Sequence, residues 1–453
     1  MAAHELSLAQ AALEIREGRL SAAELAQACF DRIEAVDGEV QAWTFLDRQH
    51  VLAQAERADD WRRQGKPLGP LHGVPIGIKD IFDTGDMPTE LGSPIHAGRT
   101  PRKDAACVAR LRAAGAVIMG KTVTTEFAYF HPGKTRNPHD PKRTPGGSSS
   151  GSAAAVAAGM VPGAIGSQTN GSVIRPASFC GVVGYKPTHG LIPRSGALLL
   201  SRALDHVGVF ARTIEDAALL AQCMAGYDEG DADTRPIAVP PLVETTRQEP
   251  PLPPRFAFVK TAAWDQAEKD TRDGFAALLE RLGESAEEVD LTASTRPIHD
   301  LHAIIMQVEM AENLRPELTR ARNQLSAPLL ELLDNGRARL AVDYRRALDL
   351  AAPMADQLES VLDEFDAILT PAAAGEAPLG LTATGSPVFC TIWSYLGMPA
   401  VSLPLLQGSN GLPIGVQLVG KRGNDARLLR TARWLVHHLN GRGRRAAAKG
   451  KQR

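Results

Sequence analysis

Two turns rich in glycine and serine constrain this chain more than any other feature of its sequence. Residues 145–152 read Pro-Gly-Gly-Ser-Ser-Ser-Gly-Ser and run into an alanine-rich segment, and residues 166–172 read Gly-Ser-Gln-Thr-Asn-Gly-Ser. Glycine has no Cβ and adopts φ angles that let successive backbone N–H groups converge on one point. Each turn is therefore expected to hold an anion beside a serine hydroxyl.

A lone lysine upstream supplies a candidate base. Residues 73–78, Gly-Val-Pro-Ile-Gly-Ile, lead directly into Lys79 and Asp80. An apolar, β-branched run of this length is typical of a buried strand, which would carry the amine of Lys79 into the interior. A solvated surface lysine is the alternative when the residue is taken alone. Lysine together with two serine-bearing turns indicates an acyl-transfer site.

The first turn has two other interpretations, a flexible linker and a phosphate-binding loop. The alanine-rich residues 153–158 have high helix propensity. The turn is therefore expected at a helix N-terminus, where unpaired amides favour an anion. A phosphate-binding loop would close with Gly-Lys-Ser or Gly-Lys-Thr. The chain has no such ending here, which favours acyl transfer.

These segments resemble the amidase signature family of serine hydrolases. The resemblance rests on the Gly-Gly-Ser-Ser-Ser-Gly loop, on Gly-Ile-Lys-Asp, and on Gly-Ser ahead of Pro-Ala-Ser-Phe-Cys-Gly. It extends to residues 136–138, 204–208 and 413–420, so it covers nearly the whole chain. The family implies hydrolysis of a carboxamide to an acid and ammonia or an amine through an acyl-serine, without a metal or an organic cofactor.

The resemblance also assigns a Ser–Ser–Lys triad. Ser172 corresponds to the nucleophile, Ser148 to a hydroxyl that relays its proton, and Lys79 to the base, with a cis peptide bond between Gly147 and Ser148. The base works only if its amine is neutral. Lowering a lysine pKa from about 10.4 to roughly 7–8 disfavours the ammonium form by about 4 kcal/mol, which burial can supply. A close carboxylate would oppose this, so Asp80 has to point away along the strand.

The backbone N–H groups of the second turn are expected to form the oxyanion hole, contributed by Thr169, Asn170, Gly171 and Ser172. The chain departs from the common family pattern here, with Gln168 in place of the usual Asp and Asn170 in place of the usual Gly. Asparagine tolerates a left-handed φ, so the turn can still form. The departure affects the substrate pocket more than the mechanism.

Four residues are candidates for substrate binding. Arg175 lies three positions after the nucleophile. The surrounding sequence resembles a subset that includes malonamidase-type enzymes, in which an arginine would hold a substrate carboxylate. Pairing of Arg175 with a structural carboxylate is the alternative. Tyr129, Phe130 and His131 precede the first turn and form either a pocket wall or part of the core.

Alternating strand-like and helical segments predict an α/β fold, an α/β/α sandwich around a mixed, mostly parallel twisted sheet. We expect one amidase domain over residues 1–440. Its core comprises 60–235 and 367–440, with a helical elaboration at about 236–366 that follows a proline-rich connection. Residues 441–453, rich in Arg and Lys, are expected to be a disordered basic tail.

The composition bears on the binding partners, the metal content and the location of the protein. The 453 residues carry a formal net charge of −2, which gives no electrostatic argument for nucleic-acid binding. Five dispersed cysteines without a Cys-x-x-Cys pair predict reduced, buried thiols and no zinc site. Without a signal peptide or a membrane-spanning run, the protein is expected in the cytoplasm. The expected partners are a small-molecule amide and, at most, a second copy of the chain, with no nucleic acid and no membrane.

Two competing functions stay open at this stage. A Ser-His-Asp hydrolase would use one of three histidines as its base and one of two aspartates to orient it. These candidates are His139, His189 or His206 with Asp140 or Asp205. The second alternative is the glutaminase-type subunit of a tRNA-dependent amidotransferase, which would use the same triad within a larger complex.

Overall fold

One large sheet organises the molecule. The computed structural model describes residues 2–450, and their side chains as far as Gly441. The sheet is 11-stranded, in the order β1-β3-β2-β4-β6-β5-β10-β11-β9-β7-β8. The strands are β1 (Trp43–Phe45), β2 (Pro75–Lys79), β3 (Val117–Thr122), β4 (Gly163–Gln168), β5 (Val183–Lys186), β6 (His206–Ala211), β7 (Phe256–Phe258), β8 (Ala286–Glu288), β9 (Ala367–Pro371), β10 (Ala400–Gln407) and β11 (Pro413–Val419).

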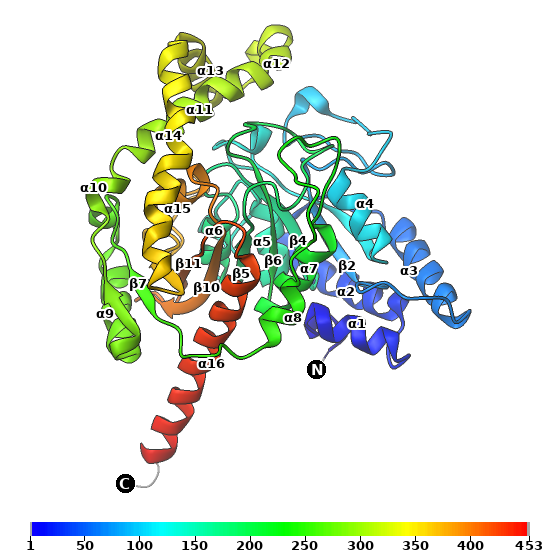
Figure 1. The fold of residues 1–453 in the computed structure, drawn as a ribbon. Helices are drawn as coiled ribbons and strands as arrows, with labels where there is room; N and C mark the ends of the chain where they lie inside the picture. The colour runs from blue at the N-terminus through cyan, green and yellow to red at the C-terminus, as the bar shows by residue number, and fades with distance from the viewer. Residues whose placement is uncertain (1, 451–453) are drawn as a thin grey trace.

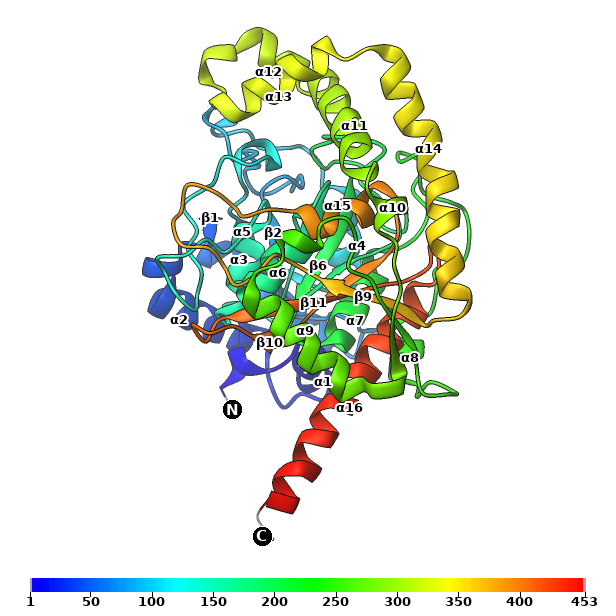
Figure 2. The ribbon, with the colours of Figure 1, turned by 90° about the vertical axis from the view of Figure 1, so that its left-hand side faces the viewer.

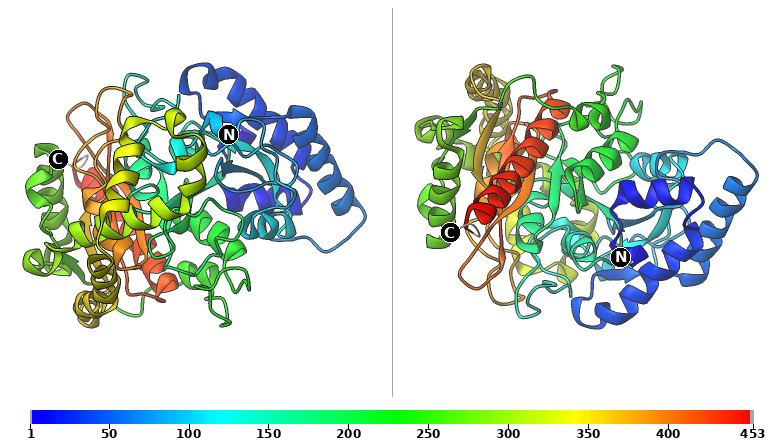
Figure 3. Two further views of the ribbon diagram at one scale, coloured as in Figure 1. Left: turned by 90° about the horizontal axis from the view of Figure 1, so that it is seen from above. Right: turned by 90° about the horizontal axis from the view of Figure 1, so that it is seen from below.

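Helices flank this sheet on both sides, as the α/β class requires (Figures 1 and 3). Seen from below, α9 and α16 lie on opposite sides of the C-terminal strands (Figure 3). The helices are α1 (Leu8–Arg16), α2 (Ala22–Val40), α3 (Arg48–Arg63), α4 (Ala106–Ala113), α5 (Ser150–Ala157), α6 (Ile174–Cys180), α7 (Ile214–Met224), α8 (Leu242–Arg247), α9 (Lys269–Leu282), α10 (Thr292–Thr295), α11 (Ile298–Asn313), α12 (Arg315–Arg320), α13 (Ala327–Ala338), α14 (Ala341–Glu359), α15 (Val388–Tyr395) and α16 (Asp425–Gly450).

The sheet is mixed, as expected, but its parallel part is smaller than the sequence suggested. Strands β2 and β3, β2 and β4, β7 and β8, and β7 and β9 pair in parallel. The other pairings, which include all those of β5, β6, β10 and β11, are antiparallel. The prediction of a mostly parallel sheet was wrong in this respect. Helix α6 returns the chain so that β5 does not pair with β4, and β6 inserts between them, antiparallel to both.

Local sequence explains the elements that position the site. Every residue of β2 is buried, because both faces of this central strand are covered. The alanine-rich α5 packs against β2 and β4, and small side chains let it approach the sheet closely. Its first residue follows Ser148 and Ser149, so the first serine turn does end at a helix N-terminus, as predicted.

Helices α11 to α14 rise above one end of the sheet and arch over it (Figure 2). They belong to the segment predicted as a helical elaboration, although this segment also contributes β7 and β8 to the sheet. The division into a core and an elaboration stays a prediction. Helix α16 continues to Gly450 through most of the expected tail, whereas residues 451–453 lie outside the described part of the chain. The disorder predicted for 441–453 stays untested.

The five cysteines are all unpaired, and four of them are buried, with Cys223 half-buried. Among the residues described, no helix combines the length and the apolar character that crossing a membrane would need.

Candidate active site

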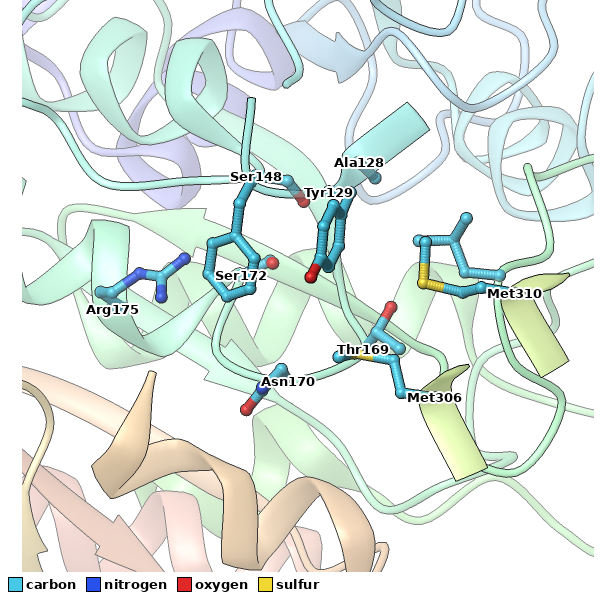
Figure 4. Close-up of a pocket in the computed structure, with 11 residues that line it drawn as sticks. Ala128, Tyr129, Ser148, Thr169, Asn170, Ser172, Arg175, Met306 and Met310 are labelled. Atoms are coloured by element: carbon cyan, nitrogen blue, oxygen red, sulfur yellow. The ribbon is translucent and has the colours of Figure 1, made fainter. Parts of the chain in front are cut away.

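The lysine and the two serines of the predicted triad come from three elements whose ends converge. Lys79 is the last residue of β2, Ser148 lies just before α5, and Ser172 lies just before α6. Strands β2 and β4 run parallel, with Ile78 opposite Ile165. The end of β2 therefore lies beside the turn that follows β4. Ser148 and Ser172 line one cavity (Figure 4).

Lys79 is fully buried, and its amine makes two hydrogen bonds. Nζ lies 2.7 Å from Ser148 Oγ and 2.8 Å from Ser167 Oγ. Burial lowers the pKa of Lys79 well below its ordinary value, and the negative charge of Asp205 raises it in part. Desolvation is the larger of the two effects, so the environment favours the neutral amine that a base requires.

Ser167 is a contact that the sequence analysis did not single out. It lies at the end of β4 and is the second serine on the lysine amine. The sequence does contain a signal for it, because Ser167 belongs to the same turn as Ser172. Once β2 and β4 are paired in parallel, the residues at their carboxyl ends become neighbours.

Asp80 does not share the environment of Lys79. Its side chain lies 3.2 Å from Lys121 Nζ and accepts a hydrogen bond from the backbone N–H of Glu90. Successive side chains of a strand point to opposite faces, which separates the carboxylate from the preceding amine. The requirement that Asp80 point away is therefore met.

The turn that carries Ser172 is held by Gln168, which is fully buried. Its Oε1 accepts the backbone N–H groups of Val173 and Ile174, both at 2.9 Å, and its Nε2 donates to Ser394 Oγ of α15 at 3.0 Å. A glutamine can thus satisfy the first amides of α6 where the family usually has an aspartate. It does so without the negative charge that an aspartate would bring.

The amides proposed for the oxyanion hole are available. Within the described residues, the backbone N–H groups of Asn170, Gly171 and Ser172 donate no hydrogen bond. Thr169 is fixed by its other groups, because Oγ1 donates to Asp205 at 2.6 Å and its carbonyl oxygen accepts from His302. Unpaired amides beside a serine hydroxyl are what an oxyanion requires. The peptide bond between Gly147 and Ser148 is cis, as the family resemblance implied.

Arg175 is buried at the cavity, and no carboxylate of the described residues pairs with it. Its Nη2 donates to the carbonyl oxygen of Gly147 at 2.7 Å and to Thr384, and its Nη1 donates to the carbonyl oxygen of Gly385 at 2.9 Å. Burial lowers the pKa of Arg175 to about 10, so the guanidinium still carries its charge at neutral pH. Within the described part of the chain, Arg175 therefore does not pair with a structural carboxylate, which was the alternative to substrate binding.

Aromatic and apolar side chains line much of the cavity, and its empty space is about 330 Å³ when the open solvent at its mouth is counted. Tyr129 and Phe130 form part of its wall, with their rings edge to face at 4.8 Å. His131 is exposed and does not line the cavity. Helix α11 contributes Met306 and Met310, which sequence patterns did not indicate.

The three histidines considered for a Ser-His-Asp mechanism bond to backbone carbonyl oxygens. The rings of His139, His189 and His206 contact the carbonyl oxygens of Cys180, Arg202 and Leu204, respectively. Asp205 holds Thr169 and the backbone amides of Leu200 and Ser201. Within the described residues, no hydrogen bond joins these imidazoles to a serine. Within the described residues, no group of three or more His, Cys, Asp or Glu side chains is arranged to hold a metal ion.

The sequence profile of the Amidase family matches residues 24–429. The chain belongs to this family. It is 34% identical to one of the glutamyl-tRNA(Gln) amidotransferase A subunits, that of Chloroflexus aggregans, over 94% of this chain and 95% of that protein. The protein is accordingly an enzyme that acts on amide C–N bonds.

Solved structures of amidases share the fold. One similar structure is described as a vestigial protein complex that reveals the evolutionary origins of an s-triazine catabolic enzyme. It has a TM-score of 0.89 and is 30% identical, over 95% of this chain and 98% of that chain. The peptide amidase PAM in complex with chymostatin has a TM-score of 0.84 and 28% identity, over 96% and 98%.

These relatives correct the expectation about partners. The sequence analysis expected a small-molecule amide and no nucleic acid. Curated relatives that match over nearly their whole length are subunits of an amidotransferase named for a tRNA, and one similar structure is a protein complex. Net charge was a poor guide here, because a nearly neutral chain can still be similar to proteins that work with a nucleic acid.

Proposed function

We propose that this chain hydrolyses a carboxamide through an acyl-Ser172 intermediate, with Ser148 and Lys79 as relay and base. The observation that carries the proposal is the buried amine of Lys79, bonded to Ser148 at 2.7 Å beside the cavity that Ser172 also lines. A hydroxyl is a weak nucleophile at neutral pH unless a base takes its proton during attack.

The chemistry proceeds in two steps. As Ser172 Oγ attacks the carbonyl carbon, its proton passes to Ser148, and the proton of Ser148 passes to the neutral Lys79. The amides of Thr169, Asn170, Gly171 and Ser172 hold the oxyanion. The same route returns a proton to the departing nitrogen, so the C–N bond breaks and ammonia or an amine leaves. Water then attacks the acyl-serine, which releases the acid and restores Ser172.

Arg175 is proposed to bind an anionic group of the substrate. A buried charge is costly unless it is paired, and among the described residues this guanidinium donates its hydrogen bonds to carbonyl and hydroxyl oxygens and lies over the ring of Phe130. A carboxylate entering the cavity would supply the missing counter-charge. Tyr129 and Phe130 are proposed to form the wall against which the substrate packs.

We further propose that the enzyme works as the amide-hydrolysing component of a tRNA-dependent amidotransferase assembly. The similarity to amidotransferase A subunits, which spans nearly the full length of both chains, supports this role. Glutamine suits it, because its side-chain carboxamide is cleavable and its α-carboxylate could pair with Arg175.

A second candidate is an amidase that acts on larger amides without a partner. Leu200, Met306 and Met310 give the cavity an apolar side that glutamine does not need. The peptide amidase similarity is consistent with this candidate.

One experiment tests the hydrolysis and separates the two candidates. Ammonia release from glutamine and from a C-terminally amidated dipeptide is measured with the chain alone, and then with the other amidotransferase subunits and glutamylated tRNA. The amidotransferase role predicts that glutamine hydrolysis rises strongly in the complete mixture. Full activity on the dipeptide amide alone, without stimulation, would favour the second candidate. Release that persists in Ser172→Ala would remove the acyl-serine proposal.

A further inference from the structure

Asn170 belongs to the turn at residues 166–172, and its side chain brings an amide group into the cavity. It is partly exposed and lines the cavity together with Ser172 and Arg175 (Figure 4). A glycine, the usual residue of the family, would leave this part of the cavity without a polar side chain. The side chain therefore distinguishes this site among related turns.

Helix α15 holds Asn170 at two points. Ser394 Oγ donates to the carbonyl oxygen of Asn170 at 2.6 Å, and Thr391 Oγ1 donates to Asn170 Oδ1 at 2.7 Å. Ser394 also accepts from Gln168, which holds the first amides of α6. The side-chain oxygen of Asn170 points away from Ser172 in Figure 4. The amide is thus fixed by a helix that lies far along the chain.

This arrangement leaves the nitrogen end of the amide free. Asn170 Nδ2 makes no hydrogen bond within the described residues. Of the side chains that the structure describes, no carboxylate lines the cavity. The cavity therefore presents a neutral donor from Asn170 and a charged donor from Arg175, with no acid among its described lining residues to satisfy either of them. A substrate that carries an oxygen acceptor on its acyl chain fits this pattern of donors.

We propose that Asn170 is a specificity-determining residue, whose Nδ2 donates to an acceptor oxygen on the acyl chain of the substrate. Thr391 acts as a positioning residue, because its hydroxyl holds Oδ1 and so presents Nδ2. The preferred substrates are amides whose acyl chain bears a carboxylate or a second carbonyl group. This inference rests on the proposed amide hydrolysis at Ser172, and it goes beyond that proposal by giving Asn170 and Thr391 a part in selecting the acyl group.

Three primary amides of equal chain length test the inference: pentanamide has no second acceptor, glutaramide has a neutral one, and glutaramic acid has a carboxylate. The readout is the kcat/KM ratio of each acceptor-bearing amide to pentanamide. Asn170→Gly should lower both ratios roughly tenfold, the effect of one lost hydrogen bond. Asn170→Asp keeps the acceptor for Thr391 but replaces the donor with a negative charge, so it should lower the glutaramic acid ratio further.

Thr391 supplies the matched comparison. Thr391→Val removes the hydroxyl at nearly constant volume and should lower the same ratios, whereas Thr391→Ser should retain them. Thr370→Val is the control, because Thr370 lies on β9 and its buried hydroxyl makes no hydrogen bond with any described residue. Equal losses on all three amides would show a general structural effect and overturn the inference. Unchanged ratios in Asn170→Gly and Asn170→Asp would overturn it as well.

A binding measurement separates this inference from the proposed hydrolysis. Calorimetry with Ser172→Ala compares the binding of glutaramic acid and of pentanamide, with and without Asn170→Gly. If the wild type cleaves none of the amides but binds glutaramic acid through Asn170, the hydrolysis proposal fails and the specificity inference stands. If Asn170→Gly binds both amides as the parent does, the inference fails whatever the activity.

Discussion

At the scale of single residues, the most informative group is the amine of Lys79, because folding removes it from water without a carboxylate in contact. Lys79→Met should reduce kcat by on the order of 10²–10⁴, the usual contribution of a general base. It should not destabilise the fold at neutral pH, because methionine fills similar volume without a charge to desolvate. Ammonia release and urea unfolding check both parts. A variant that retained most of its hydrolysis would contradict the assigned base.

The lowered pKa of Lys79 predicts the direction in which stability changes with pH, which a titration can test. Between its lowered native pKa and its unfolded value of about 10.4, the unfolded chain binds more protons at this site than the native chain. This site therefore makes stability rise with pH over that window, and activity should fall as acid protonates the amine. Lys79→Met should flatten the stability slope, whereas Lys142→Met, at an exposed position, should leave it unchanged.

Arg175 combines two roles that substitution can separate. It holds the carbonyl oxygen of Gly147, next to Ser148, and it faces the cavity. Arg175→Met should therefore slow the hydrolysis of every amide, but the loss should be about tenfold or more greater for glutaramic acid than for pentanamide. Steady-state kinetics on the two substrates measure the difference. Equal losses on both would restrict Arg175 to its structural contacts.

At the scale of elements, Gln168 couples β4, α6 and α15. Gln168→Ala would leave the first amides of α6 without their acceptor in a dry environment, a cost of about 1–3 kcal/mol. It should also lower kcat, because the same turn carries Ser172. Urea unfolding and steady-state kinetics test this pair of effects. Gln64→Ala, at an exposed position, is the matched control. A stable Gln168→Ala variant with normal kcat would contradict the coupling.

The sequence predicts best what depends on neighbouring residues. The first serine turn ends at the N-terminus of α5, as its alanine-rich continuation predicted, and every residue of the apolar run that forms β2 is buried, as expected. Contacts between distant segments could not be predicted. Thr391 and Ser394 of α15 bond to Asn170, although 221 and 224 residues of sequence separate them from it. Strand direction was misjudged for the same reason, since pairing partners depend on how the whole sheet closes.

At the scale of the whole molecule, strand order argues that the chain unfolds as one unit. Strand β10, from the C-terminal part, pairs with β5, and β9 pairs with both β11 and β7. No cut through the sheet separates the predicted core from the helical elaboration without breaking backbone hydrogen bonds. Variants that keep only Trp43, next to β3, or only Trp434, on α16, report opposite parts of the molecule. Their fluorescence transitions in urea should coincide with each other and with circular dichroism. Two separated transitions would show that the chain contains independent domains and would contradict the prediction of a single one.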